Sequence, residues 1–129
     1  MSFDIGQLRF DDGKQTEGVW VDYAMGLEFL VARWNNPKHR ELKRKQAEEI
    51  ANRARRSNQD SDVEALLLAQ VCETICNGWR GMDDASGPIE WSRETSYKIL
   101  SEIEEFREFV IDQSNSFGNY RATEEDAKN

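Results

Sequence analysis

Hydrophobic and polar residues alternate over two stretches in the N-terminal third of the chain, residues 16–23 and 27–33. This period of two, carried largely by β-branched and aromatic residues, is typical of strands with one buried face. Residues 7–10 precede an Asp-Asp-Gly sequence at 11–13, which favours a hairpin because glycine readily adopts a positive φ. The three stretches predict a short antiparallel β-meander. Its strands could pair within the chain or with a neighbouring copy, because an exposed strand edge is a template for assembly.

A period of 3.6 residues predicts helices over residues 37–56, 62–77 and 93–115. The first helix begins at Asn36-Pro37, because asparagine caps exposed amides and proline at the first helical position has no N–H to lose. Its apolar stripe is narrow, so we expect it to lie on the surface with a basic face in water. The second helix has a wide apolar arc and is interpreted as the core helix.

Capping residues define the predicted ends of the second and third helices. Ser61 and Glu64 form a capping box before the second helix, and Gly78 is placed to end it in the left-handed conformation. Ser92 is placed to cap the third helix, in which a break is expected near Ser101.

A length of 129 residues fits one domain, since single cores usually take roughly 100–150 residues. The pattern predicts the α+β class, with a short N-terminal antiparallel β-meander packed on a mainly α-helical domain of three to four helices, residues 1–117. Residues 118–129 lack periodicity and are acidic, which predicts a flexible tail. No stretch approaches the ~20 apolar residues of a membrane span, and no signal-peptide pattern is present, so we expect a reducing cytoplasm.

Charge is unevenly distributed along the chain. There are 17 basic and 25 acidic residues, a net charge of -8, yet the segment 33–56 holds nine basic and three acidic residues. This segment could be a solvated helix face, or a contact surface for an acidic partner. For the second interpretation the candidate residues are Arg40, Lys43 and Arg44.

The residues offer little for catalysis, a metal or a cofactor. His39 is the only histidine, and it falls in the first turn of a helix expected to be solvated. Nucleophile-elbow, phosphate-loop, dinucleotide-binding and metal-ligand motifs are all missing from the sequence. Cys72 and Cys76 are four residues apart and could in principle bind a metal, but a zinc site needs about four ligands, so buried core thiols are the favoured interpretation. We therefore expect a protein that is not an enzyme and that has no cofactor.

Two tryptophans, Trp79 and Trp91, lie at the ends of a loop of mostly small and polar residues. They could be anchors buried against the helices, or they or the exposed Met82 and Ile89 could form a contact site, because tryptophan is enriched at binding hot spots. The sequence leaves both roles open.

The loop and its flanks resemble the tail assembly chaperones of long-tailed bacteriophages and prophages. The resemblance rests on a helix followed by the string Gly78-Trp79-x-Gly81-x-Asp83-Asp84-x-x-Gly87-Pro88-Ile89-x-Trp91-Ser92, then an Ile99-Leu100 helix, and on Asn35-Asn36-Pro37-Lys38 after an upstream strand. It covers about residues 18–117. Trp91 stands where the family has Phe or Tyr.

The resemblance implies a non-enzymatic chaperone in the cytoplasm of the infected host. Such a protein coats the tape measure protein, can recruit tail tube subunits, associates with itself and is absent from the mature virion. A programmed frameshift often extends family members at the C-terminus. The competing hypotheses are a nucleic-acid-associated protein that uses the basic helix 38–56, and a small enzyme, for which no catalytic constellation is found.

Overall fold

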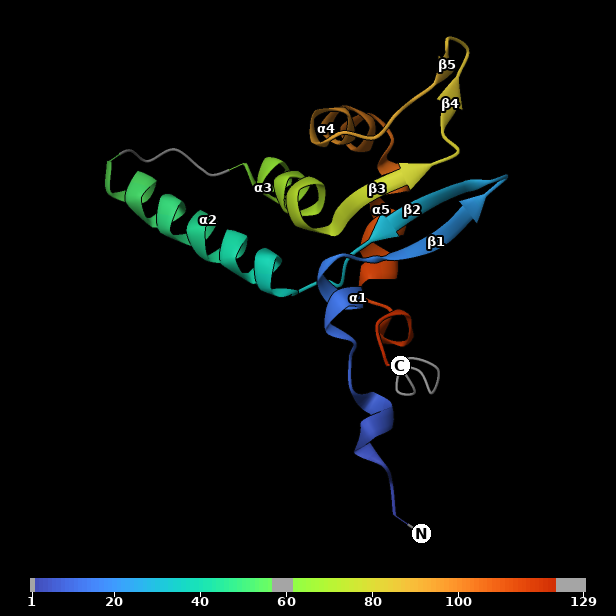
Figure 1. Ribbon diagram of the computed structural model, residues 1–129. Coiled ribbons are helices and arrows are strands. Elements are labelled where there is room, and N and C mark those ends of the chain that lie inside the picture. Colours follow the sequence, from blue (N-terminus) through green and yellow to red (C-terminus); the bar gives the residue numbers. More distant parts are fainter. Residues whose placement is uncertain (1, 57–61, 123–129) are drawn as a thin grey trace.

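The computed structural model describes residues 2–56 and 62–122, and it confirms the α+β class (Figure 1). In chain order the elements are η1 (Ile5–Leu8), α1 (Asp12–Thr16), β1 (Val19–Ala24), β2 (Leu27–Val31), α2 (Pro37–Arg56), α3 (Val63–Gln70), η2 (Val71–Ile75), β3 (Cys76–Arg80), β4 (Asp83–Asp84), β5 (Gly87–Pro88), α4 (Arg93–Glu102), α5 (Glu104–Ser114) and η3 (Phe117–Asn119). Among the described helices, none is long and apolar enough to cross a membrane.

The main sheet is antiparallel, with β2 in the middle of the order β1-β2-β3. Alternate residues of β2 point into the core, so Leu27, Phe29 and Val31 are buried. The predicted strands at 16–23 and 27–33 are therefore present with slightly shifted ends.

The predicted first strand and its hairpin are wrong. Residues 5–8 form a short 3-10 helix, and the Asp11 carboxylate accepts a hydrogen bond from the Lys14 amide at 2.9 Å, which caps α1. An aspartate before Asp-Gly serves equally well as a helix cap and as a turn residue, and capping prevails here. The third strand of the sheet is instead β3, from a later part of the chain.

The predicted core helix ends early. α3 passes into a wide π-helical turn, η2, after which the chain enters β3 and pairs with β2. Gly78 therefore lies inside a strand and does not end a helix. The apolar spacing of the helix continues into residues 76–80, and pairing with the free edge of β2 decides for strand. Asp62 caps α3 at 3.1 Å from the Ala65 amide, whereas Ser61 of the predicted capping box lies outside the described residues.

The core is an aromatic cluster centred on Phe29, which is fully buried. Its ring centroid lies 5.4 Å from Phe106, 5.9 Å from Phe109 and 6.3 Å from both Tyr23 and Trp79. These rings come from β1, β3 and α5, so the cluster holds α5 against one face of the sheet.

The third predicted helix is two helices. α4 begins at the predicted cap, where the Ser92 hydroxyl accepts a hydrogen bond from the Thr95 amide at 3.0 Å. The helical path breaks at Ile103, whose φ of -113° and ψ of 89° are not helical, two residues beyond the expected break near Ser101. α5 then turns to cover the sheet.

α2 has the predicted bounds, 37–56, but polar side chains attach it to the domain. The Asn36 carboxamide accepts a hydrogen bond from the His39 amide at 3.0 Å, as expected of a cap, and also donates to the Thr74 carbonyl at 3.1 Å. His39 is fully buried, which corrects the expectation that it is solvated. Its Nδ1 accepts from the Asn35 amide and its Nε2 contacts the Gln70 Oε1, each at 2.8 Å.

This chain of polar contacts continues along the interface between α2 and α3. The Gln70 amide donates to the Gln46 Oε1 at 2.8 Å, and the Gln46 amide donates to the Leu66 carbonyl at 3.1 Å. Burial lowers the pKa of His39 below its ordinary value of 6.5, and nearby Lys43 acts in the same direction. The imidazole is therefore neutral where α2 is docked.

The C-terminal segment is ordered further than predicted. Tyr120 is fully buried, and its hydroxyl donates to the Val31 carbonyl at 3.0 Å. The Asp11 amide donates to the Tyr120 carbonyl at 2.7 Å, and Phe10 forms a β-bridge with Arg121. The predicted tail from residue 118 is therefore wrong for residues 118–122, because the aromatic side chain of Tyr120 fills the core; residues 123–129 lie outside the described residues.

Two glycines meet where the β1–β2 turn approaches the chain after β3. Gly26 and Gly81 have φ values of 86° and 81°. A Cβ at Gly81 would overlap with the carbonyl of Gly26, whereas a Cβ at Gly26 would meet no atom within 4 Å. The two backbones can come this close only because residue 81 has no side chain.

We expect Gly81→Ala to destabilise the fold more than Gly26→Ala. Both substitutions force alanine into left-handed backbone, which costs about 1–2 kcal/mol. Only Gly81→Ala adds an overlap with backbone, worth a further ~2 kcal/mol. Urea unfolding of the two variants measures the difference, and equal losses would show that the close approach is not a constraint.

We also expect stability to depend on pH through His39. Its folded pKa lies below that of the unfolded chain, so its contribution is complete above about pH 6.5 and is lost as pH falls. The loss is at most about 1.4 kcal/mol for each pH unit. Unfolding between pH 7.5 and 5.5 tests this: His39→Gln should flatten the slope, and a variant with the wild-type slope would rule out His39 as its source.

Candidate functional site

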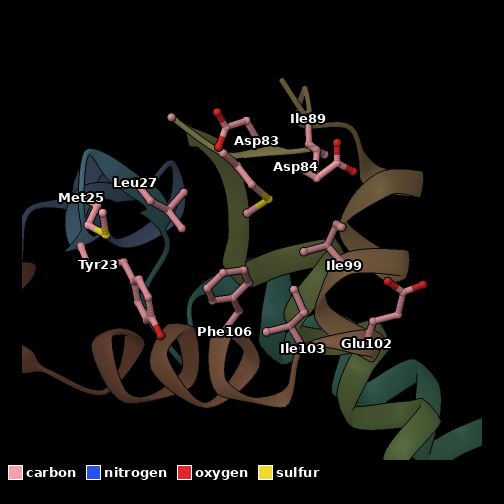
Figure 2. A pocket seen from close by; sticks show the side chains of 13 residues that line it. Tyr23, Met25, Leu27, Asp83, Asp84, Ile89, Ile99, Glu102, Ile103 and Phe106 are labelled. Carbon is pink, nitrogen blue, oxygen red and sulfur yellow. The ribbon is translucent and has the colours of Figure 1, made fainter. Parts of the chain in front are cut away.

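A cleft of about 540 Å³ opens between the tip of the β1–β2 hairpin, the β4–β5 hairpin and the junction of α4 with α5 (Figure 2). Thirteen residues line it: Tyr23, Ala24, Met25, Leu27, Gly81, Met82, Asp83, Asp84, Ile89, Ile99, Glu102, Ile103 and Phe106. They come from separated parts of the chain, so the cleft exists only in the folded protein.

The interior of the cleft is apolar. Leu27, Met82 and Ile99 are buried core residues that line the hollow. Figure 2 shows Leu27 and Ile99 on opposite sides of it, and Phe106 extends the aromatic cluster to its wall. Met25 is fully exposed on the hairpin tip, and Ile103 is 37% exposed at the helix break. These two side chains place apolar surface at the mouth, where a partner could reach it.

The charged residues that line the cleft are all acidic: Asp83, Asp84 and Glu102. Asp84 has a structural role, because its carboxylate accepts a hydrogen bond from the Ser86 amide at 2.8 Å in the turn before β5. A fourth carboxylate, that of Glu105, lies beside the lining and is hydrogen-bonded to Tyr23. This hydrogen bond, together with partial burial, raises the pKa of Tyr23. The mouth therefore combines apolar contact area with negative charge.

The loop residues singled out from the sequence are more buried than a contact site requires. Trp79 is 6% exposed, and its indole N–H donates to the Ile89 carbonyl at 2.8 Å, so it is a core anchor. Met82 was expected to be exposed, but it is only 8% exposed because it lies under the cleft, which it lines. Trp91 is half-buried, with the Arg93 guanidinium 4.9 Å from its ring.

The basic residues singled out on α2 do not line the cleft. Arg40 donates to the Asn35 carbonyl at 3.0 Å, and Lys43 bonds the Asn35 side chain. Arg44 is paired with Glu41 at 2.7 Å and with Glu48 at 2.8 Å, and this pairing lowers the pKa of Glu41. The positive charge available to a phosphate on this helix is smaller than the sequence count suggests.

The two cysteines are buried free thiols, as interpreted from the sequence. Burial raises the pKa of Cys72 to about 11 and that of Cys76 to about 12, so neither is a thiolate at neutral pH. Within residues 2–56 and 62–122, no group of three or more His, Cys, Asp or Glu side chains is placed to hold a metal ion.

Sequence reasoning missed most of the cleft. Of its lining, only Met82 and Ile89 were singled out as contact residues, while Met25, Glu102 and Ile103 were passed over. One signal was available, a methionine followed by glycine at a hairpin tip, which exposes a large apolar side chain. The spacing of residues along the sequence does not predict that the β4–β5 hairpin lies close to the α4–α5 junction.

A family model, described as YdaY prophage protein, matches residues 34–129, which is 96 of the 129 residues. The match includes α2 to α5 and the acidic side of the cleft, but not the β1–β2 hairpin. No curated protein and no solved structure matches the chain. The expectation of a prophage protein is confirmed at this level: the chain belongs to the YdaY prophage protein family.

Proposed function

We propose that this prophage protein is a non-enzymatic assembly chaperone that holds an apolar segment of another phage protein in the cleft. The observation that carries the proposal is an open, apolar cleft with Met25 and Ile103 exposed at its mouth. Its volume lies within the roughly 300–1,000 Å³ typical of ligand sites. An amphipathic segment could place one or two large side chains there while its polar face stays in water.

The chemistry of the lining supports binding over catalysis. His39, the only histidine of the chain, is buried in the first turn of α2 against Gln70 of α3 and does not line the cleft. The thiols of Cys72 and Cys76 are buried and protonated. The polar side chains of the lining are carboxylates and one tyrosine, and general acid–base or nucleophilic chemistry usually needs a second group held against them.

The tape measure protein is the partner that we propose. The resemblance to tail assembly chaperones over residues 18–117 supports this choice, and membership of a prophage family is consistent with it. Tail tube subunits and a second copy of the chain are further proposed partners. The protein would then act in the host cytoplasm and be left out of the mature virion.

A double substitution at the cleft mouth tests the proposal. Met25→Asn suits the positive φ of residue 25, and Ile103→Asn places a favoured capping residue at the start of α5, so both should leave the fold and the charge of the rim intact. We expect the double variant to bind the tape measure protein of the same prophage at least tenfold more weakly than wild type. Binding is measured by calorimetry, with size-exclusion chromatography and light scattering to give the stoichiometry.

Val63→Asn is the matched control, because Val63 is 73% exposed and does not line the cleft. It should bind like wild type. If wild type ignores the tape measure protein, or if the double variant binds as tightly as the control, the proposed function is wrong.

A further inference from the structure

We infer that the cleft selects segments in which a large apolar side chain is flanked by lysine or arginine. This inference rests on the proposed function and specifies the chemistry of the partner. Among the thirteen lining residues, three are acidic and none is basic. The next two residues of the chain beyond Ile103, Glu104 and Glu105, are also acidic and exposed.

Part of this acidity has a structural reason that does not require a ligand. Glu104 and Glu105 lie in the first turn of α5, where the helix dipole favours carboxylates. Asp84 supports its turn through the Ser86 amide. These three residues alone would not argue for a cationic partner.

For Glu102 and Asp83, neither a helix N-terminus nor a turn hydrogen bond explains the carboxylate. Glu102 is the last residue of α4, and the last turn of that helix has no basic residue, although the dipole favours cations there. Asp83 is exposed in β4. Figure 2 shows Glu102 and Asp83 at separate edges of the same hollow.

The neighbouring arginines are engaged in contacts outside the cleft. The Arg80 guanidinium is bonded to Glu28 and lies 4.0 Å from the Trp20 ring centroid. Arg107 donates to the Leu100 carbonyl at 3.1 Å. Neither residue lines the cleft. Low-dielectric walls concentrate the field of the rim carboxylates, so a lysine or arginine beside the apolar anchor gains while an acidic residue is repelled.

A yeast-displayed library of random 16-residue peptides, sorted for binding to the full-length protein, tests the inference. We expect enriched peptides to carry a large apolar residue flanked by Lys or Arg, and to bind more weakly as salt rises. Protein with Asp83→Lys and Glu102→Lys should bind these peptides at least tenfold more weakly, and should select acidic flanks from the same library.

The matched control carries Glu108→Lys and Asp112→Lys, which change net charge equally on exposed α5 positions outside the cleft. It should bind like wild type. The neutral pair Asp83→Asn and Glu102→Gln should give an intermediate loss, and it replaces the reversed pair if thermal melting shows that the latter does not fold.

Three outcomes would overturn the inference: enriched peptides without an excess of basic residues, no enrichment at all, or equal losses in the cleft variant and its control. An oligomer of the protein alone that dissociates on charge reversal would also overturn it, because a second copy would then occupy the cleft. The library contains no phage sequence, so failure to bind the tape measure protein is a separate result. Conversely, if the protein captures apolar peptides irrespective of their charge, only the preference for lysine and arginine is refuted, and the proposed function is not.

Discussion

The packing of four aromatic rings around Phe29 is the interaction on which the rest of the structure depends. Phe29 lies in the middle strand, and its neighbours come from both adjacent strands and from α5. Aromatic pairs of this kind add about 0.5–1.5 kcal/mol each beyond their buried area. The cluster fixes Tyr23 and Phe106, two residues of the cleft wall, so the same contacts that close the core also shape the binding surface.

The domain is held together in two different ways. The sheet, α4 and α5 share an apolar core, whereas α2 is joined to α3 and η2 through Asn36, His39, Gln46 and Gln70. Hydrogen bonds contribute little net stability but are costly to leave unmade when buried. The attachment of α2 is therefore specific in geometry and sensitive to protonation, while the cleft is supported mainly by apolar and aromatic contacts.

Local patterns predicted the elements whose signals are local. The cap at Asn36, the full extent of α2, the cap at Ser92 and the β1–β2 pair follow from spacing and capping chemistry. The segment 76–80 was misjudged because the apolar spacing of the helix continues into it, whereas its conformation is decided by pairing with the edge of β2. His39 and Met82 were judged by their neighbours in sequence. The burial of His39 depends on contacts more than 30 residues away, and that of Met82 depends on a distant hairpin. The cleft joins the β1–β2 turn to the α4–α5 junction, about 80 residues later. The spacing of hydrophobic residues along the chain does not predict a contact between segments so far apart.

The contact between the two ends of the described chain has a consequence for synthesis. Phe10 and Asp11 pair with Tyr120 and Arg121, across more than a hundred intervening residues. Tyr120 also completes the core beneath Val31. During translation this contact cannot form until residue 120 has emerged from the ribosome. Until then the N-terminal segment has no docking site on the domain. Its apolar residues Phe3, Ile5 and Leu8 remain exposed even in the finished fold, and during translation they would be open to chaperones of the host.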